Sequence, residues 1–131
     1  SCGTSGDGTA TAATQAEMET ATSTSVCVTP GRTQYHPGVA KVWVTFTTTG
    51  SITTSYNTTS ITDTGVGDWT VNMTTAMSTA ATNALITSRG TAALYGHMYD
   101  QGAGLAKFNM RDAGGTLAES DGATVVMWGD Q

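Results

Sequence analysis

The sequence has little charge. Only 11% of its 131 residues are Asp, Glu, Lys or Arg, well below the roughly one quarter that is usual in a soluble domain. Five residues are Lys or Arg, and they are scattered along the chain. Binding to a nucleic-acid backbone needs clustered cations. We therefore expect no nucleic-acid partner for this chain, whose net charge is −5.

Long apolar runs, cysteine and proline are also scarce. No segment approaches the roughly 18 consecutive apolar residues that a membrane-spanning helix needs, so we expect no membrane association. The only cysteines are Cys2 and Cys27, which permit one disulfide worth about 3 kcal/mol or else remain as two free thiols. Zinc is not indicated, because neither a CxxC motif nor paired histidines accompany them.

Threonine and glycine fill much of the remaining sequence. Threonine takes about a fifth of all positions, and its β-branched side chain suits a half-buried pleated surface. Strands are expected at residues 41–47, 51–62, 69–75, 83–88, 92–99, 105–111 and 123–128, and the best-defined hairpin spans residues 55–75. Residues 77–84 could form a helical turn instead. Short strands separated by Gly-rich turns predict an all-β fold, a small antiparallel β-sandwich.

The first predicted strand has two faces of different character. Val42, Val44 and Phe46 alternate on one face, whereas Lys41 and Trp43 lie on the other. Because Trp43 faces away from the apolar set, we expect it to pack on the helix or on another subunit.

The first forty residues follow another pattern. Residues 1–12 have no periodicity and are rich in Gly, Ser and Thr, which is typical of an extended arm. Thr14 and Glu17 have the spacing of a capping box that begins a two-turn helix. Pro30 and Gly31 predict a turn, because proline presets its φ and Gly31 can take a positive φ. The expected parts are an N-terminal anchoring arm (1–12), a short linker helix with a Pro/Gly turn (13–38) and the β-sandwich domain (39–131).

Two stretches resemble modules of bacteriophage virion proteins. They are ATQAEMETATSTSVCVTPGR at residues 13–32 and SYNTTSITDTGVGDWTVNM at residues 55–73. Similar modules occur in the distal domains of tail fibres and in small head-fibre or decoration proteins. There the first stretch is a linker helix leading into the terminal domain, and the second is a hairpin of a small, commonly trimeric β-domain. Cys27 departs from that pattern, as does the lack of an aromatic residue after Met77.

The resemblance implies a non-enzymatic structural protein at the virion surface, most simply a capsid decoration or head-fibre protein. Its partners would be phage capsid or tail proteins, bound through the N-terminal segment. A homotrimer is expected, because closed rotational symmetry removes exposed sheet edges. One alternative is the distal domain of a tail fibre that binds a host surface glycan or receptor. Others are a secreted carbohydrate-binding module and a small hydrolase.

Few residues suggest chemistry. Arg32, Tyr35 and His36 lie at a turn and His97 lies between aromatics, but no nucleophile elbow accompanies either histidine. The acidic residues lie in the arm, the helix start and turns, as solvated groups do, which argues against a glycosidase pair. The loops at residues 63–68 and 116–122 lack the ligand spacing of a calcium site. We expect no catalytic residue, no metal and no cofactor.

Some large side chains are candidates for inter-subunit or ligand contacts. They are Trp43, Tyr35, His36, Tyr95, His97 and Tyr99. An exposed aromatic ring on a Thr-rich surface could stack on a sugar, although packing in the core or between subunits is the commoner use of such rings.

Overall fold

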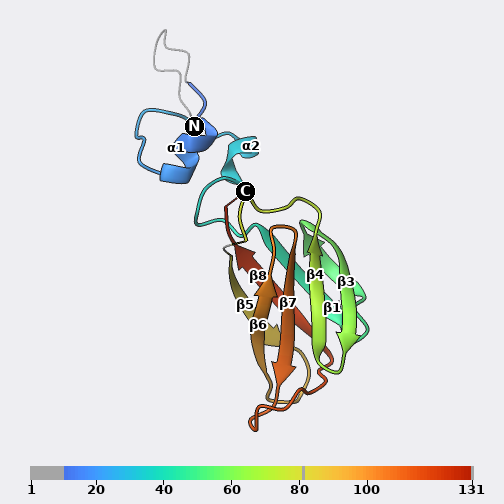
Figure 1. Ribbon diagram of the computed structural model, residues 1–131. Helices are drawn as coiled ribbons and strands as arrows, with labels where there is room; N and C mark the ends of the chain where they lie inside the picture. Colours follow the sequence, from blue (N-terminus) through green and yellow to red (C-terminus); the bar gives the residue numbers. More distant parts are fainter. Residues whose placement is uncertain (1–10, 81, 131) are drawn as a thin grey trace. The chain divides into compact units, whose positions relative to one another are not determined.

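The computed structural model of the chain describes residues 11–80 and 82–130 (Figure 1). The chain divides into two compact units, residues 1–39 and 40–131. Most of the expected N-terminal arm, including Cys2, lies outside the described residues. No helix within the described ranges is long and apolar enough to cross a membrane.

The N-terminal unit begins with the predicted helix. α1 (Gln15–Thr20) carries the capping box that the sequence predicts. The hydroxyl of Thr14 accepts the Glu17 N–H at 3.2 Å, and the Glu17 carboxylate accepts the Thr14 N–H at 2.9 Å. The Thr14 hydroxyl also donates to this carboxylate at 2.9 Å. The two bonds that the carboxylate accepts, first the one from the Thr14 backbone N–H and then the one from the hydroxyl, lower the pKa of Glu17. Ala21, in the left-handed conformation, ends the helix.

A short helix lies where the sequence predicts a Pro/Gly turn. α2 (Pro30–Thr33) has Pro30 at its start, where the fixed φ of proline suits a helix and the missing N–H costs nothing. Gly31 lies inside this helical turn and does not use the positive φ that is open to glycine. A parallel bridge between Ala12 and Cys27 joins the segments that lead into the two helices.

The second unit is an all-β fold, as predicted. Its strands are β1 (Val42–Thr47), β2 (Ile52–Tyr56), β3 (Thr58–Gly65), β4 (Asp68–Met73), β5 (Asn83–Ser88), β6 (Tyr95–Gln101), β7 (Leu105–Arg111) and β8 (Gly122–Trp128). All pairs are antiparallel, in the order β2-β1-β8-β5-β6-β7-β4-β3.

The sheet folds over on itself to form a sandwich. β5 and β6 share a single registered pair, Thr87 with Tyr95, so the sheet bends there into two four-stranded halves (Figure 1). Gly96 permits this corner, because a Cβ at its position would lie 2.5 Å from Cγ2 of Ile86. At the opposite side, the edge strands β2 and β3 approach each other, which nearly closes the sheet.

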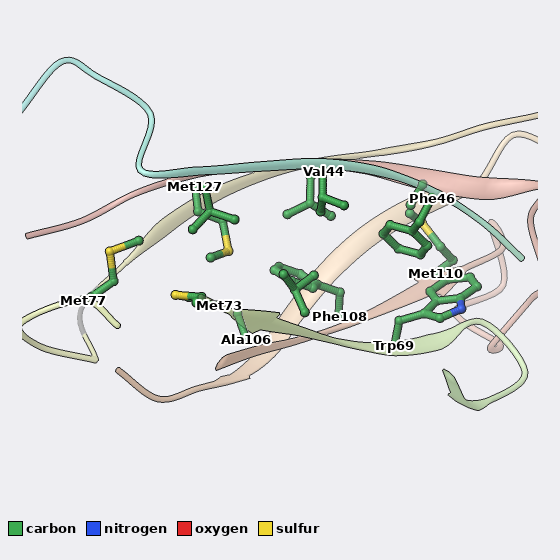
Figure 2. Packing of buried hydrophobic residues seen from close by; sticks show 13 residues of the cluster. Val44, Phe46, Trp69, Met73, Met77, Ala106, Phe108, Met110 and Met127 are labelled. Carbon is green, nitrogen blue, oxygen red and sulfur yellow. The ribbon is translucent and has the colours of Figure 1, made fainter. Parts of the chain in front are cut away.

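Apolar faces of the two halves meet in the core (Figure 2). The alternations predicted for β1 and β4 are confirmed, since the members of each set are buried: Val42, Val44 and Phe46 on β1, and Trp69, Val71 and Met73 on β4. The rings of Phe46 and Trp69 meet edge to face with centroids 5.5 Å apart. Figure 2 shows Met73, Met77 and Met127 gathered at the other end of the core.

Three local expectations are wrong. Lys41 does not share the outer face with Trp43: it precedes β1, its N–H donates to the carbonyl of Met127, and its side chain is buried. Residues 51–62 form two strands rather than one, because the chain turns at Asn57. The described part of residues 77–84 contains no helical turn, and β5 begins at Asn83.

Asn57 forms the corner that carries the chain from one half to the other. It has a φ of 53°, in the left-handed region that Asn tolerates better than most residues. Its Nδ2 donates to the carbonyls of Lys41 (3.1 Å) and Thr75 (3.0 Å), and its Oδ1 accepts the Thr75 N–H at 2.7 Å. One side chain therefore ties the segment before β1 to the segment after β4.

Replacing Asn57 should destabilise the sandwich. Asn57→Ala removes three hydrogen bonds and places Ala in the left-handed region, so we expect a loss of about 3 kcal/mol in the free energy of unfolding. Asn57→Gly keeps the backbone conformation available and should lose less. Urea unfolding followed by circular dichroism measures both variants. An Asn57→Ala variant within about 0.5 kcal/mol of the parent protein would contradict this account of the corner.

Candidate functional site

Three of the predicted contact residues lie together on one strand. Tyr95, His97 and Tyr99 are exposed on the outer face of β6, while the alternate side chain Met98 packs against the core. A register shift after Met98 makes Tyr99 an extra residue in the strand. Across to β7, Tyr95 pairs with Arg111 and His97 pairs with Asn109.

The next strands complete this surface. Asn109 of β7 pairs in turn with Asp68 of β4. We name the resulting set the tyrosine face; its members are Tyr95, His97, Tyr99, Asn109, Arg111 and Asp68. All six residues belong to three neighbouring strands of the sheet.

Hydrogen bonds fix two pairs within the tyrosine face. The hydroxyl of Tyr99 donates to a carboxylate oxygen of Asp68 at 2.8 Å, across β7. Partial burial raises the pKa of Tyr99, and the hydrogen bond to Asp68 and the negative charges of Asp68 and Asp100 raise it further. Arg111 donates from Nε to Oδ1 of Asn109 at 3.1 Å and from a terminal nitrogen to the carbonyl of Gly115 at 2.7 Å.

Asn109 lies at the base of the tyrosine face, with only 5% of its surface exposed. Beside this set, Lys107 forms an ion pair with Asp100 at 2.7 Å, and this contact lowers the pKa of Asp100. The surface therefore offers two phenol rings, an imidazole, an amide and fixed charges of both signs. Such a combination suits noncovalent binding of a polar ligand by stacking and hydrogen bonds.

Trp43 belongs to a different surface. It lies on the outer face of β1, in the other half of the sandwich, and is exposed. Its cross-strand neighbours are Tyr56 on β2 and Val126 on β8. The structure therefore does not bring Trp43 together with the tyrosines of β6.

Tyr35 and His36 lie in the N-terminal unit. The guanidinium of Arg32 lies over the ring of Tyr35, 5.9 Å from its centroid. Nδ1 of His36 accepts the Gly38 N–H at 3.0 Å. Both contacts are local ones, between residues two or three positions apart, as in a folded turn.

A small apolar pocket of about 190 Å³ also belongs to the N-terminal unit. The residues that line it are Ala13, Glu17, Met18, Ala21, Ser23, Val26, Val28 and His36. Its volume is below the roughly 300 Å³ at which sites for drug-sized ligands begin. Cys27, in the same unit, is disulfide-bonded; Cys2, the other cysteine of the predicted pair, lies outside the described residues.

The acidic loops make structural contacts. The carboxylate of Asp63 accepts the Gly65 N–H at 3.1 Å, and that of Glu119 accepts the Gly67 N–H at 3.2 Å. Asp112 accepts the N–H groups of Gly114 and Thr116, both at 2.9 Å. Within the described ranges, no three His, Cys, Asp or Glu side chains are grouped so that they could hold a metal ion.

Comparison with known proteins gives no relative. No protein-family model matches the chain, and neither a curated protein nor a solved structure is significantly similar to it. The likeness to phage virion modules therefore rests on the two sequence stretches alone.

The sequence indicates the three aromatic residues of β6 but not their neighbours on the sheet. Asp68 lies next to the hairpin loop in the sequence, and Asn109 and Arg111 show only the pattern of a strand. Their proximity depends on the pairing of β6, β7 and β4 and on the shift after Met98. A repeat of polar residues at alternate positions of β7 is the one signal in the sequence that points to this face.

Asp68→Asn should lower the pKa of Tyr99. The substitution removes the negative charge and the anionic acceptor, while the contribution of partial burial remains. Ultraviolet titration at alkaline pH measures the change. The titration curve of a matched variant with Tyr99→Phe is subtracted, so that only the Tyr99 phenol contributes. Asp63→Asn is the matched control and should leave the Tyr99 pKa unaltered. A Tyr99 pKa that is the same in Asp68→Asn and in the parent protein would contradict the assigned contact.

Proposed function

We propose that this protein is a non-enzymatic structural protein of a bacteriophage virion, a capsid decoration or head-fibre protein at the virion surface. Its N-terminal segment attaches to capsid proteins, or to tail proteins, and its sandwich is displayed. It assembles as a homotrimer. The observation that carries the proposal is the division of the chain into a small N-terminal unit and a separate β-sandwich, in the order that the phage-like stretches imply.

The contacts of the ionisable side chains favour binding over catalysis. Asp100 is paired with Lys107, and Asp68 accepts the hydroxyl of Tyr99. The imidazole of His36 accepts a backbone N–H two residues along the chain. Nucleophilic catalysis would need a nucleophile hydrogen-bonded to a base that a third group orients. The contacts described for these side chains are of another kind.

The N-terminal unit has a surface suited to attachment. Met18 and Ala13 are buried in it, but Val28 is exposed and lines the apolar pocket. A helix of six residues is marginal by itself, so contact with another protein would stabilise this unit. Covering exposed Val28 together with the apolar pocket would remove apolar surface from water, so we expect the contact to include this residue.

The attachment can be tested with two matched valine variants. Val28 and Val66 are similarly exposed, at 55% and 60%, but lie in different units. A charge at Val28 should be buried in the contact, so we expect Val28→Asp to weaken binding to phage heads about tenfold, and Val66→Asp to leave it unchanged. Cosedimentation of labelled protein with separated heads and tails of the phage that encodes the chain measures this.

A variant that lacks residues 1–12 tests whether this segment contributes to attachment, and because the deletion also removes Cys2, Cys2→Ser is its control. If the parent protein binds neither heads nor tails, the virion structural role is contradicted. If the parent protein binds tail ends alone, capsid decoration is excluded. Equal binding by Val28→Asp and the parent protein would refute attachment through this part of the N-terminal unit.

The tyrosine face supports a second candidate function, glycan binding. It would serve either the distal domain of a tail fibre, whose partner is a host surface glycan or receptor, or a secreted carbohydrate-binding module. The specific observation is that exposed Tyr95 and Tyr99 flank His97 on one strand. Aromatic faces stack on the apolar faces of sugars, and the neighbouring polar groups can bind hydroxyls.

Glycan binding should depend on the tyrosines of β6 and not on Tyr56. Tyr99 and Tyr56 are each 44% exposed but lie on opposite halves of the sandwich. On a glycan array, Tyr95→Ala and Tyr99→Ala should each weaken binding about tenfold, while Tyr56→Ala should bind as the parent protein does. Equal losses in all three variants, or no bound glycan, would contradict this function.

A further inference from the structure

The charges of the sandwich are segregated between its two halves. β2, β1, β8 and β5 contain no Asp, Glu, Lys or Arg along their whole length. The other four strands carry Asp63, Asp68, Asp100, Lys107 and Arg111. Near the uncharged half, the exposed charges Arg89, Asp121 and Asp130 lie beyond the ends of the strands.

A continuous apolar row crosses the outer face of the uncharged half. Trp43 pairs with Tyr56 on one side and with Val126 on the other, and Val126 pairs with Leu85. The row therefore reaches across all four strands. Leu85 is 59% exposed and Trp43 38%, so the protein leaves large apolar side chains in solvent where threonine would suit a strand equally well.

The adjacent row consists of threonines. Thr45 pairs with Thr54 and Thr124, and Thr124 pairs with Thr87. The hydroxyls of Thr45 and Thr124 lie 3.0 Å apart and share a hydrogen bond. Beside the apolar row there is thus a second row of short, neutral side chains. We name these two rows together the uncharged face.

We propose that the uncharged face is the surface through which copies of this chain associate with one another. In a rotationally symmetric assembly the same patch of each copy meets near the axis, so any charge there faces its own like charge. An uncharged surface avoids this repulsion in a chain with a net charge of −5. The core of an interface is also depleted in charge and enriched in Tyr and Trp, as this row is.

This assignment concerns the protein in solution and is independent of its attachment to a virion. The charged outer face, with Tyr95, His97 and Tyr99, remains in solvent when the uncharged face is buried. Binding to phage particles and self-association can therefore fail separately: a monomeric protein that binds heads would overturn this inference and the proposed homotrimer, but not the attachment to the virion.

The test uses one lysine in the apolar row and a matched lysine elsewhere. Leu85→Lys places a cation at the β5 end of the apolar row, at its most exposed aliphatic side chain, and Val66→Lys places one at the tip of the β3–β4 hairpin, where the side chain is 60% exposed. Sedimentation equilibrium of the full chain from low to high micromolar concentration gives the mass. We expect the parent protein and Val66→Lys to associate alike, and Leu85→Lys to have a dissociation constant at least about tenfold higher.

Thr54→Lys, in the threonine row, repeats the test at an exposed position of the edge strand. This variant should weaken association as Leu85→Lys does. Melting curves check that each variant is folded. A parent protein with the mass of one chain throughout would overturn the inference. So would association of the folded Leu85→Lys and Thr54→Lys variants at the strength of the parent protein, or an equal loss in Val66→Lys.

Discussion

The contact between Phe46 and Trp69 joins the two halves of the sandwich, and the rest of the fold depends on the burial that surrounds it. Phe46 comes from β1 and Trp69 from β4, and the indole N–H of Trp69 donates to the carbonyl of Thr48, just after β1, at 3.0 Å. Each half presents alternate side chains to this core, so the remaining side chains must face outward. Gly96 at one corner and Asn57 at the other let the halves come together.

The core does not include the outward-facing side chains, so the two outer faces of the sandwich can differ in composition. Those of β2, β1, β8 and β5 bear no charge, whereas β6, β7, β4 and β3 carry all the charged strand residues. Folding alone does not require this division, since either face could be covered with threonine and lysine. An uncharged face with a row of large apolar side chains has the composition of a protein contact surface, which we propose it to be, and we assign ligand binding to the polar face with two tyrosines as a proposal.

The sequence predicted what depends on local periodicity. The alternation of Val42, Val44 and Phe46 identified a buried face, and Thr14 with Glu17 identified the start of α1. What it could not predict depends on register between distant strands. Leu85 and Trp43 are far apart in sequence, and only the pairing of β1 and β5 with β8 places them in one row. The alternation predicts the wrong face for Lys41, because this residue lies one position before the strand begins.

Footprinting of side chains by hydroxyl radicals tests most directly whether the two outer faces have different partners. Oxidation is compared in the full chain below and above the concentration at which it associates. Trp43 and Leu85 should become protected on association, while Tyr95 and Tyr99 should react as before. Protection of Tyr95 and Tyr99 with Trp43 and Leu85 unchanged would contradict this assignment of the two faces.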